Sequence, residues 1–308
     1  MVLMRIMSLY QSSPYCMLAC MRVPRLPEVS FEFFPPREPA GADLLQATAQ
    51  RLAPLRPRFV SVTCGADGST VSRTPDCVQQ LASDTGLRVV PHLTCVAADR
   101  EALLAQAAEY WREGRRQLVV LRGDRPAGAG EGSRLVFDHA TELVAALERV
   151  APFDMAVAAY PEGHPDSGSV VADIDNLGRK AAAGARRAIT QFCFDADGIL
   201  RYREQCRAAG INIPVVPGIL PIVDFAQVRR FAARCGATIP DWLQRRFAAA
   251  GEDAGARRRV AAEVLVEHVL ELRAAGFDAF HFYTLNRADL TFEACLALGL
   301  QADSAVPA

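Results

Sequence analysis

Lysine is almost absent from this chain of 308 residues, although basic side chains are plentiful. Lysine and arginine together number 34, and Lys180 is the single lysine among them. A genomic bias toward arginine codons would explain this scarcity without any functional cause. Arginine and lysine are not interchangeable at compact charged sites, so the one lysine that remains is also a candidate for a specific role.

No excess of charge of either sign is present. The 35 acidic residues nearly balance the basic ones, and the formal net charge is −1. Surfaces that bind nucleic acid carry a basic excess, so we expect no nucleic-acid partner. No stretch is long and apolar enough to cross a bilayer, so we expect no membrane partner. Half of the residues are nevertheless hydrophobic, which allows a sizeable core and argues against disorder.

Paired cysteine motifs are missing as well. The nine cysteines form no Cys-x-x-Cys pair and no cluster with histidine at the spacing of a zinc site, so we expect no bound metal. Scattered thiols in a long chain are typical of a reducing compartment, which favours a cytoplasmic protein. Five of the six methionines lie in the first 26 residues, which lack the clean apolar run of a signal peptide. Residues 1–26 are therefore expected to be a disordered tail or a misassigned start.

Short apolar runs alternate with longer helical segments along the rest of the chain. Continuous apolar runs are typical of parallel strands that are buried on both faces. The expected strands are Val29–Phe34, Phe59–Thr63, Arg88–Leu93, Gln117–Leu121, Met155–Tyr160, Ala188–Phe192, Pro214–Ile219 and Ala279–Thr284. The expected helices include Ala42–Leu52, Arg100–Arg112, Phe137–Arg149, Val170–Ala183, Ala196–Ala209, Asp241–Ala250 and Arg257–Ala275.

Eight repeats of strand and helix predict an α/β fold with a single closed (β/α)8 barrel of the TIM type. An open doubly wound sheet would need a glycine-rich phosphate loop after its first strand, and none is present. The barrel is expected to span residues 27–299, with a short tail over residues 300–308. The glycines expected to end helices before strands are Gly86, Gly114, Gly184, Gly210 and Gly276.

Polar residues follow seven of the eight expected strands. Barrels of this type carry their active sites at the C-terminal ends of the strands, so these side chains are expected to share one rim. A purely structural barrel gives no reason for such a concentration. The residues are Glu32, Thr63, His92, Arg122, Asp124, Tyr160, Glu162, His164, Gln191, Tyr283, Thr284, Asn286 and Arg287.

Glu32 lies in the apolar and rigid segment Phe31-Glu32-Phe33-Phe34-Pro35-Pro36. Burial in such surroundings raises the pKa of a carboxyl and makes it a usable acid near neutral pH. The structural alternative is a glutamate inside the barrel that pairs with an arginine. An unpaired buried acid costs stability, so we favour the functional interpretation.

Three other rim residues each have an ordinary structural alternative. Asp124 follows Gly123, which allows a tight turn toward the barrel mouth, but an aspartate can also simply cap its own loop. His92 could be a core histidine with its hydrogen bonds satisfied. The ring of Tyr160 could stack on a planar ligand or pack in the core.

Eight segments, one at each expected strand, resemble the motifs of the methylenetetrahydrofolate reductase family in its bacterial, catalytic-domain-only form. Each motif alone is modest, but eight in the order of the family make a specific match from residue 29 to about residue 299. The segments are Val29–Pro36, Phe59–Thr63, Pro91–Cys95, Leu121–Asp124, Ala158–Glu162, Ala188–Phe192, Pro217–Pro221 and His281–Arg287.

The resemblance implies a barrel with FAD at the C-terminal face of the strands. NADH or NADPH would reduce the flavin and leave, and 5,10-methylenetetrahydrofolate would then accept hydride from flavin N5. The product, 5-methyltetrahydrofolate, supplies methyl groups for methionine synthesis. Glu32 would be the general acid that protonates the folate, and Asp124 would be a carboxylate near the flavin and the pterin. Relatives also imply a homo-oligomer.

The resemblance also implies binding positions. The flavin-binding positions are Thr63, Cys64, Ala66, His92, Arg122, Gly123, Asp124, Tyr160, His164, Asp173, Asn176, Arg179 and Lys180. The folate-binding positions are Gln191, Gln227, Phe231 and Arg287. Lys180 falls among the contacts to the flavin phosphates, where a cation suits the charge. Cys64 stands where the family has an aromatic residue, so looser packing of the flavin is expected there.

Rival functions make different demands on the sequence. A Schiff-base aldolase needs a buried lysine at a strand end, whereas Lys180 lies on an expected helix. A metal-dependent hydrolase is disfavoured because His92, His164 and His281 lie on different strands. A flavin- or folate-binding barrel with a different redox substrate, or without turnover, is the remaining alternative. The presence of Glu32 argues for catalysis, and a yellow colour would identify a flavoprotein.

Overall fold

The computed structural model describes residues 26–64, 73–123 and 134–302. The expected N-terminal tail, apart from Leu26, and residues 303–308 of the expected C-terminal tail lie outside the described residues. Two expected site residues, Ala66 and Asp124, also lie outside them. Among the described helices, none combines the length and apolar character that crossing a bilayer requires.

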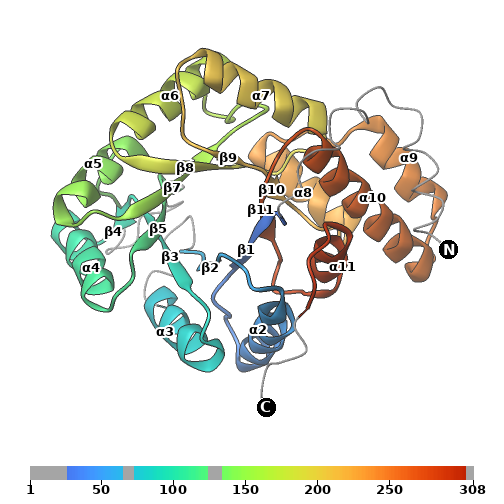
Figure 1. Ribbon diagram of the computed structural model, residues 1–308, viewed down its shortest axis with the longest axis horizontal. Helices are drawn as coiled ribbons and strands as arrows, with labels where there is room; N and C mark the ends of the chain where they lie inside the picture. Colours follow the sequence, from blue (N-terminus) through green and yellow to red (C-terminus); the bar gives the residue numbers. More distant parts are fainter. Residues whose placement is uncertain (1–25, 65–72, 124–133, 303–308) are drawn as a thin grey trace.

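A ring of parallel strands forms the centre of the molecule (Figure 1). The strands pair in the order β10-β11-β1-β2-β3-β5-β7-β8-β9. All eight expected strand positions are occupied, so the predicted barrel is confirmed. The bounds are β1 (Glu28–Phe33), β2 (Phe59–Val62), β3 (Val89–Thr94), β5 (Gln117–Leu121), β7 (Asp154–Ala159), β8 (Ala185–Thr190), β9 (Val215–Val216), β10 (Gly218–Ile219) and β11 (Ala279–Tyr283).

The seventh expected strand is divided in two at Pro217. A proline has no amide hydrogen to donate to a ladder, so β9 ends before it and β10 begins after it. β9 pairs with β8, and β10 pairs with β11. Gly218 follows at a point where no side chain fits, because a Cβ would lie 2.0 Å from the carbonyl oxygen of Thr190. The divided strand thus brings the two edges of the ring together.

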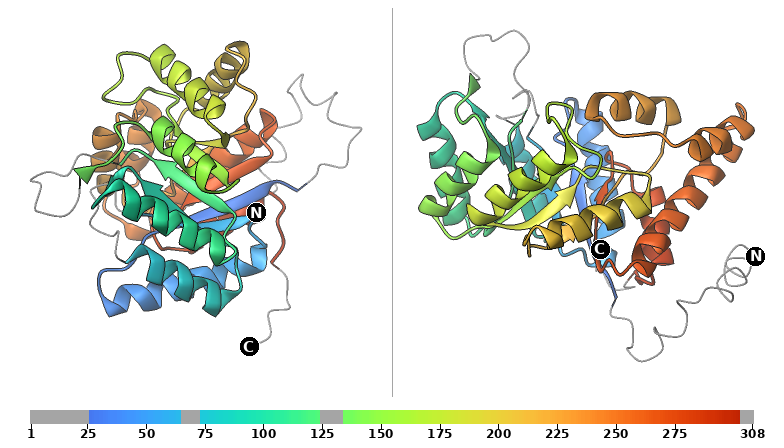
Figure 2. Two further views of the ribbon diagram at one scale, coloured as in Figure 1. Left: turned by 90° about the vertical axis from the view of Figure 1, so that its left-hand side faces the viewer. Right: turned by 90° about the horizontal axis from the view of Figure 1, so that it is seen from above.

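Helices surround the ring of strands (Figures 1 and 2). α2 begins three residues before its expected start, with proline in its first turn. α5 begins three residues after its own expected start. The five expected glycines all have positive φ at the ends of helices. The bounds are α2 (Pro39–Leu52), α3 (Thr74–Thr85), α4 (Arg100–Arg112), α5 (Ala140–Val150), α6 (Val170–Ala182), α7 (Ala196–Ala208), α8 (Phe225–Cys235), α9 (Asp241–Ala249), α10 (Ala254–Ala274) and α11 (Asp289–Ala297), with the 3₁₀ helix η3 (Ala53–Leu55).

One small sheet was not expected from the sequence. β4 (Val96–Ala97) pairs antiparallel with β6 (Arg134–Leu135) beside the C-terminal ends of β3 and β5. Strands of two residues leave no readable alternation, so the pattern along the chain could not reveal them.

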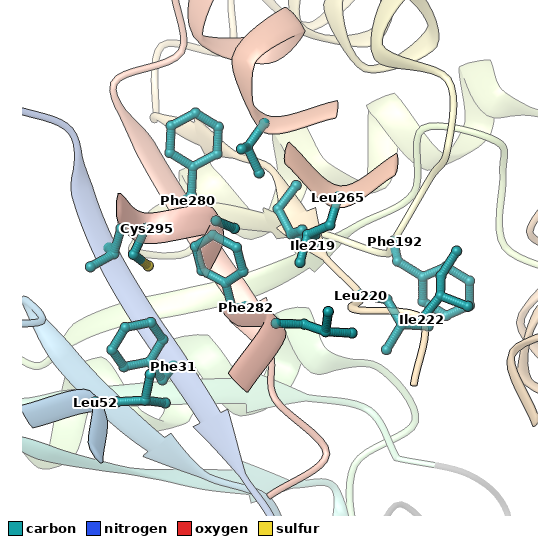
Figure 3. Close-up of a cluster of buried hydrophobic side chains, with 14 of the residues drawn as sticks. Phe31, Leu52, Phe192, Ile219, Leu220, Ile222, Leu265, Phe280, Phe282 and Cys295 are labelled. Atoms are coloured by element: carbon teal, nitrogen blue, oxygen red, sulfur yellow. The ribbon is translucent and has the colours of Figure 1, made fainter. Parts of the chain in front are cut away.

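The two faces of the barrel strands differ in chemistry. Successive side chains on a strand point to opposite faces. On the outer face, Phe31 and Phe282 pack with Leu52 and Cys295 beneath the helices (Figure 3). On the inner face, an apolar layer closes the lower barrel, formed by Phe59, Val90, Val119, Ala156, Ile189 and Val216. Polar side chains lie above this layer, toward the C-terminal rim, and they position the candidate site.

Candidate active site

The carboxyl of Glu32 lies near the C-terminal end of β1, beside two histidines from other strands. Its Oε2 atom is 3.4 Å from Nε2 of His281 and 3.5 Å from Nε2 of His92. Both imidazoles are buried, whereas the Glu32 side chain is 21 % exposed. Glu32 pairs in register with Tyr283 of β11 and Ser61 of β2. The structure thus brings Glu32 and His92 together as expected at one rim.

The direction of the pKa shift at Glu32 is opposite to the one expected from its apolar sequence context. Burial does raise the pKa of this carboxyl, and burial is the largest single influence. The hydrogen bond with His281 and the electrostatic interactions with His92 and His281 act together against it, and the net pKa is lowered. The expectation was wrong because the neighbouring imidazoles come from strands far away in the sequence. The carboxylate is the favoured form in the open site.

His92 has no hydrogen-bond partner among the described residues. Both of its ring nitrogens are buried and unpaired there, and burial lowers its pKa to about 4 despite the attraction of Glu32. The described residues thus record no hydrogen bond that would make His92 a satisfied core histidine, and its polar neighbour is the Glu32 carboxylate, 3.5 Å from Nε2. A buried polar group without a partner costs stability, and this one faces the barrel mouth beside Glu32.

His281 and Ser30 belong to the same cluster, although sequence reasoning did not select them as site residues. Nδ1 of His281 lies 2.8 Å from Oγ of Ser30, and the ring is fully buried. Both residues sit two positions before a rim residue on their strands, and this spacing places all four side chains on the inner face. That alternation was the available signal.

Two polar residues after β11 hold the end of β1 rather than face a ligand. The hydroxyl of Thr284 donates to the carbonyl of Glu32 at 2.7 Å. The side-chain amide of Asn286 accepts from the backbone nitrogen of Phe34 at 3.1 Å and donates to its carbonyl at 3.0 Å. Leu285 and Asn286 both adopt left-handed backbone angles, which turn the chain back toward β1. These contacts position the Glu32 carboxyl.

A second cluster lies in the loop between β7 and α6. Asp173 organises this loop, because its carboxylate accepts from the backbone nitrogen of His164 and from the hydroxyl of Ser167, both at 2.7 Å. The rings of Tyr160 and His164 meet edge to face, with centroids 4.8 Å apart. Three flavin-binding positions implied by the family resemblance thus lie close together, namely Tyr160, His164 and Asp173. Lys180 is the fourth.

Lys180 is buried on α6, and its Nζ donates to the carbonyl of Ala158 at 3.0 Å. The same atom lies 5.8 Å from the centre of the Tyr160 ring. Burial lowers the pKa of Lys180 to about 8, against the attraction of Asp173. The lysine is on a helix, as expected, yet its side chain reaches the C-terminal half of β7.

The remaining flavin-binding positions lie around the same rim. Arg122 and Gly123 follow β5, and the guanidinium of Arg122 pairs with Asp166 at 2.8 Å. Thr63 and the buried Cys64 follow β2. Asn176 is half-buried and Arg179 is exposed on α6. No contact in the described residues distinguishes either of these two as a ligand position.

The four folate-binding positions come from three separate elements. Gln191 follows β8, and its Oε1 atom accepts from the backbone nitrogen of Phe192 at 3.0 Å. Gln227 and Phe231 lie one turn apart on α8, so they share a face of that helix. Arg287 is exposed after β11. The geometry brings Gln191 to the rim with a side-chain amide nitrogen for which the described residues record no hydrogen bond.

Glu162 does not contribute to this rim, contrary to expectation. Its carboxylate accepts from the backbone nitrogen of Thr238 at 3.2 Å, so it fastens the connection between α8 and α9. It also lines a cavity of about 840 Å³ next to α7, α9 and α10. That cavity contains none of the expected catalytic or binding residues.

Comparison with known proteins places the chain in a family. A sequence model described as methylenetetrahydrofolate reductase matches residues 23–299. This chain belongs to the methylenetetrahydrofolate reductase family. It is 44 % identical over 273 residues to the 5,10-methylenetetrahydrofolate reductases of Salmonella typhimurium and Escherichia coli, covering 89 % of this chain and 91 % of each relative.

Solved structures agree with the barrel fold of this reductase-family chain. A Clostridium thermocellum protein that binds two copies of 5-methyl-5,6,7,8-tetrahydrofolic acid superposes with a TM-score of 0.57 at 13 % identity, covering 89 % of this chain and 94 % of that one. An F420-dependent secondary alcohol dehydrogenase gives a TM-score of 0.51 at 10 % identity, covering 90 % of this chain and 98 % of that one. At such identities the likeness concerns the fold alone.

Proposed function

We propose that this chain reduces 5,10-methylenetetrahydrofolate to 5-methyltetrahydrofolate, with FAD as cofactor and NADH or NADPH as hydride donor. The observation that carries the proposal is the Glu32 carboxyl, held between two buried imidazoles at the mouth of a barrel of this family. A carboxyl so placed can deliver a proton to a ligand that lies across the rim.

The described residues fit a flavin at this rim. The orphaned ring nitrogens of His92 leave hydrogen-bonding capacity that a bound group could use. Lys180 is a buried cation that donates a hydrogen bond to the carbonyl of Ala158, and a cation so placed suits a pyrophosphate. We propose the full set implied by the family for holding FAD, with Ala66 and Asp124 outside the described residues. FAD held there would supply the chemistry of hydride transfer from a nicotinamide to the folate.

Glu32 acts in this proposal as the proton donor to the folate. Without a ligand, the site favours the carboxylate form of Glu32. A bound ligand therefore has to shift the equilibrium toward the protonated carboxyl. A planar ligand across the rim would remove water from the exposed fifth of the side chain, and desolvation raises the pKa of a carboxyl. Glu32 would then hold its proton when the substrate is in place.

The folate would be held by residues from several elements. Gln191 offers its amide nitrogen at the end of β8, and Gln227 and Phe231 approach from α8 in the proposal. Arg287, exposed after β11, suits the carboxylate of a folate glutamate tail because a guanidinium binds carboxylates in a forked geometry. Asp124 is proposed as the second carboxylate near the pterin.

The order of binding in this proposal is ping-pong: the nicotinamide leaves before the folate takes its place. The Clostridium thermocellum neighbour binds a methylated folate, which is compatible with a folate on this fold. We further propose a barrel domain over residues 27–299, a cytoplasmic homo-oligomer, and a role in supplying methyl groups for methionine synthesis.

An anaerobic titration tests the proposal. Purified protein reconstituted with FAD is mixed with NADH or NADPH until the flavin absorbance bleaches, and 5,10-methylenetetrahydrofolate is then added. We expect absorbance to return with one equivalent of 5-methyltetrahydrofolate formed. A flavin that bleaches but ignores the folate would leave the alternative of a flavin-binding barrel with another redox substrate. A protein that binds no FAD would exclude the flavin mechanism.

A further inference from the structure

Ser30, His281 and Glu32 form a continuous line inside the barrel. Oγ of Ser30 lies 2.8 Å from Nδ1 of His281, and Nε2 of the same ring lies 3.4 Å from Oε2 of Glu32. Ser30 is 5 % exposed and His281 is fully buried. The two nitrogens of one imidazole therefore connect the buried hydroxyl of Ser30 to the partly exposed carboxyl of Glu32.

The hydroxyl of Ser30 has two acceptors within reach. One is Nδ1 of His281, and the other is the carbonyl of Phe280 at 3.3 Å. A hydroxyl has one hydrogen to donate and lone pairs to accept. If it donates to Nδ1, the proton of a neutral ring must be on Nε2. If it donates to the Phe280 carbonyl, its oxygen can accept from Nδ1–H, and Nε2 then carries a lone pair.

These two arrangements present opposite partners to Glu32. With the proton on Nε2, the ring donates toward Oε2, which suits a carboxylate. With the proton on Nδ1, the ring offers a lone pair, which suits a protonated carboxyl that can donate. Both arrangements satisfy Ser30 and both ring nitrogens without moving a heavy atom.

We propose that the hydroxyl of Ser30 makes both tautomers of His281 available by partnering Nδ1 in either one, and that the tautomer present decides whether Glu32 faces a hydrogen-bond donor or an acceptor. The inference rests on the proposed function, in which Glu32 must carry a proton when folate is bound. Ser30 and His281 are positioning residues here. The change of tautomer moves a ring hydrogen between Nδ1 and Nε2 of His281, and the proton that Glu32 delivers enters from solvent at the barrel mouth.

The other groups that face this line do not replace the role of Ser30. His92 approaches Oε2 of Glu32 from β3 at 3.5 Å, and burial holds it neutral by lowering its pKa to about 4. Tyr283, the neighbour of Glu32 on β11, has a pKa raised well above its usual value by burial, and its hydroxyl donates to the carbonyl of Thr190 at 2.7 Å. Ser61 on β2 is fully buried, with no hydrogen-bond partner for its hydroxyl among the described residues.

The test compares two buried serines on the inner face. Ser30→Ala removes the hydroxyl that partners Nδ1 of His281 in both tautomers, whereas Ser61→Ala removes a buried hydroxyl for which the described residues record no hydrogen bond. The rate at which 5,10-methylenetetrahydrofolate reoxidises the reduced flavin is measured against pH for each variant. Reduction of the flavin by NADH is measured beside it, because that step needs no proton from Glu32.

In Ser30→Ala, Nδ1 has nothing to donate to, so the ring should place its proton on Nε2 and favour the carboxylate of Glu32. We expect the descending limb of the pH profile to move to lower pH, which slows reoxidation at neutral pH by about tenfold for each unit moved. Flavin reduction by NADH should be unchanged. In Ser61→Ala the descending limb should stay at the pH of the wild type. In Ser30→Thr, which restores a hydroxyl, the limb should return to the wild-type pH.

A direct reading of the tautomer does not depend on turnover. Nitrogen-15 NMR of histidine-labelled protein distinguishes Nδ1–H from Nε2–H, and the chain has five histidines, so the signals of His281 can be assigned by their loss in His281→Gln. Wild type should pass from Nδ1–H to Nε2–H as pH rises through the limb, and Ser30→Ala should show Nε2–H throughout. One unchanged tautomer in wild type, or an equal shift of the limb in both alanine variants, would overturn the inference. A wild-type flavin that folate cannot reoxidise would instead contradict the proposed function, and the NMR comparison would still test the tautomer.

Discussion

The two faces of β1 and β11 use the same backbone for different purposes. On the outer face, Phe31 and Phe282 are fully buried against the helices, 6.1 Å apart between ring centres. On the inner face, Ser30 and Glu32 alternate with them and meet His281. A strand reverses its facing at each residue, so one short segment can supply both the core and the site.

The two faces contribute to the free energy of folding with opposite sign. Burial of large apolar side chains on the outer face stabilises the fold, whereas buried polar groups on the inner face cost stability unless they find partners. His92 keeps two unpaired ring nitrogens in the described structure. The inner face therefore gives up stability that the outer face has to supply, and substitutions on the two faces should have different consequences.

The largest effect is expected from Glu32→Gln on the inner face. The amide keeps the shape but cannot donate a proton as an acid, so reoxidation of the flavin by 5,10-methylenetetrahydrofolate should slow by roughly 10²–10⁴-fold. Stopped-flow absorbance measures that step, and flavin reduction by NADH serves as the control because it should change little. Equal loss in both half-reactions would mean that Glu32 serves to hold the flavin.

Phe282→Ala tests the outer face in the same way. Removing a fully buried ring leaves a cavity, and the free energy of unfolding should fall by about 3–5 kcal/mol. Urea denaturation followed by circular dichroism measures the loss. The exposed Leu296 on α11, 47 % accessible, gives a matched control, since Leu296→Ala should change stability by less than about 0.5 kcal/mol. A small loss of unfolding free energy in Phe282→Ala would contradict the inference that the outer face supplies most of the stability.

Acid stability extends the comparison, because a buried imidazole occurs in the surrounding helices as well as inside the barrel. Burial lowers the pKa of His268 on α10 to about 4, from 6.5 in the unfolded chain, against a hydrogen bond to the backbone of Cys193. The unfolded chain binds more protons between these values, so stability falls as pH drops from 6.5 toward 4. The loss should approach about 3 kcal/mol.

Urea midpoints at pH 7.5 and pH 4.5 measure this loss for wild type and for His268→Asn. The variant should lose less stability than wild type over the same interval, while the contribution of His92 remains in both. An identical pH dependence in the two proteins would show that His268 is already protonated, or solvated, in the folded state.

The smallest effect is expected at the side chain of Asn286, which joins the chain after β11 to the end of β1. Asn286→Ala leaves the backbone groups of Phe34 without their side-chain partners, which should cost about 1–3 kcal/mol of stability. Because the Asn286 side chain positions the end of β1, the rate of folate reduction should fall more than the affinity for FAD. Thermal unfolding and flavin binding, measured on the same samples, separate the two effects. An unchanged melting temperature would contradict a stabilising role for the Asn286 hydrogen bonds.

Much of the barrel could be predicted from the chain alone. The eight strands and the glycines that end five helices are local features, because apolar runs and positive φ depend on neighbouring residues. The position of Glu32 at a rim follows from the end of a local pattern in the same way. Pro217 was visible too, yet its division of a strand matters only because β8 and β11 lie on either side of it.

The order of strands and helices, the placement of polar residues at strand ends and the family of the chain could all be predicted from the amino-acid sequence. The chemistry of those polar residues depends instead on the tertiary structure. Glu32 and His281 are separated by 249 positions, and their approach reverses the pKa shift that the apolar context of Glu32 predicts. Local patterns report which way a side chain points, whereas electrostatic interactions depend on what the fold brings within a few ångströms of it.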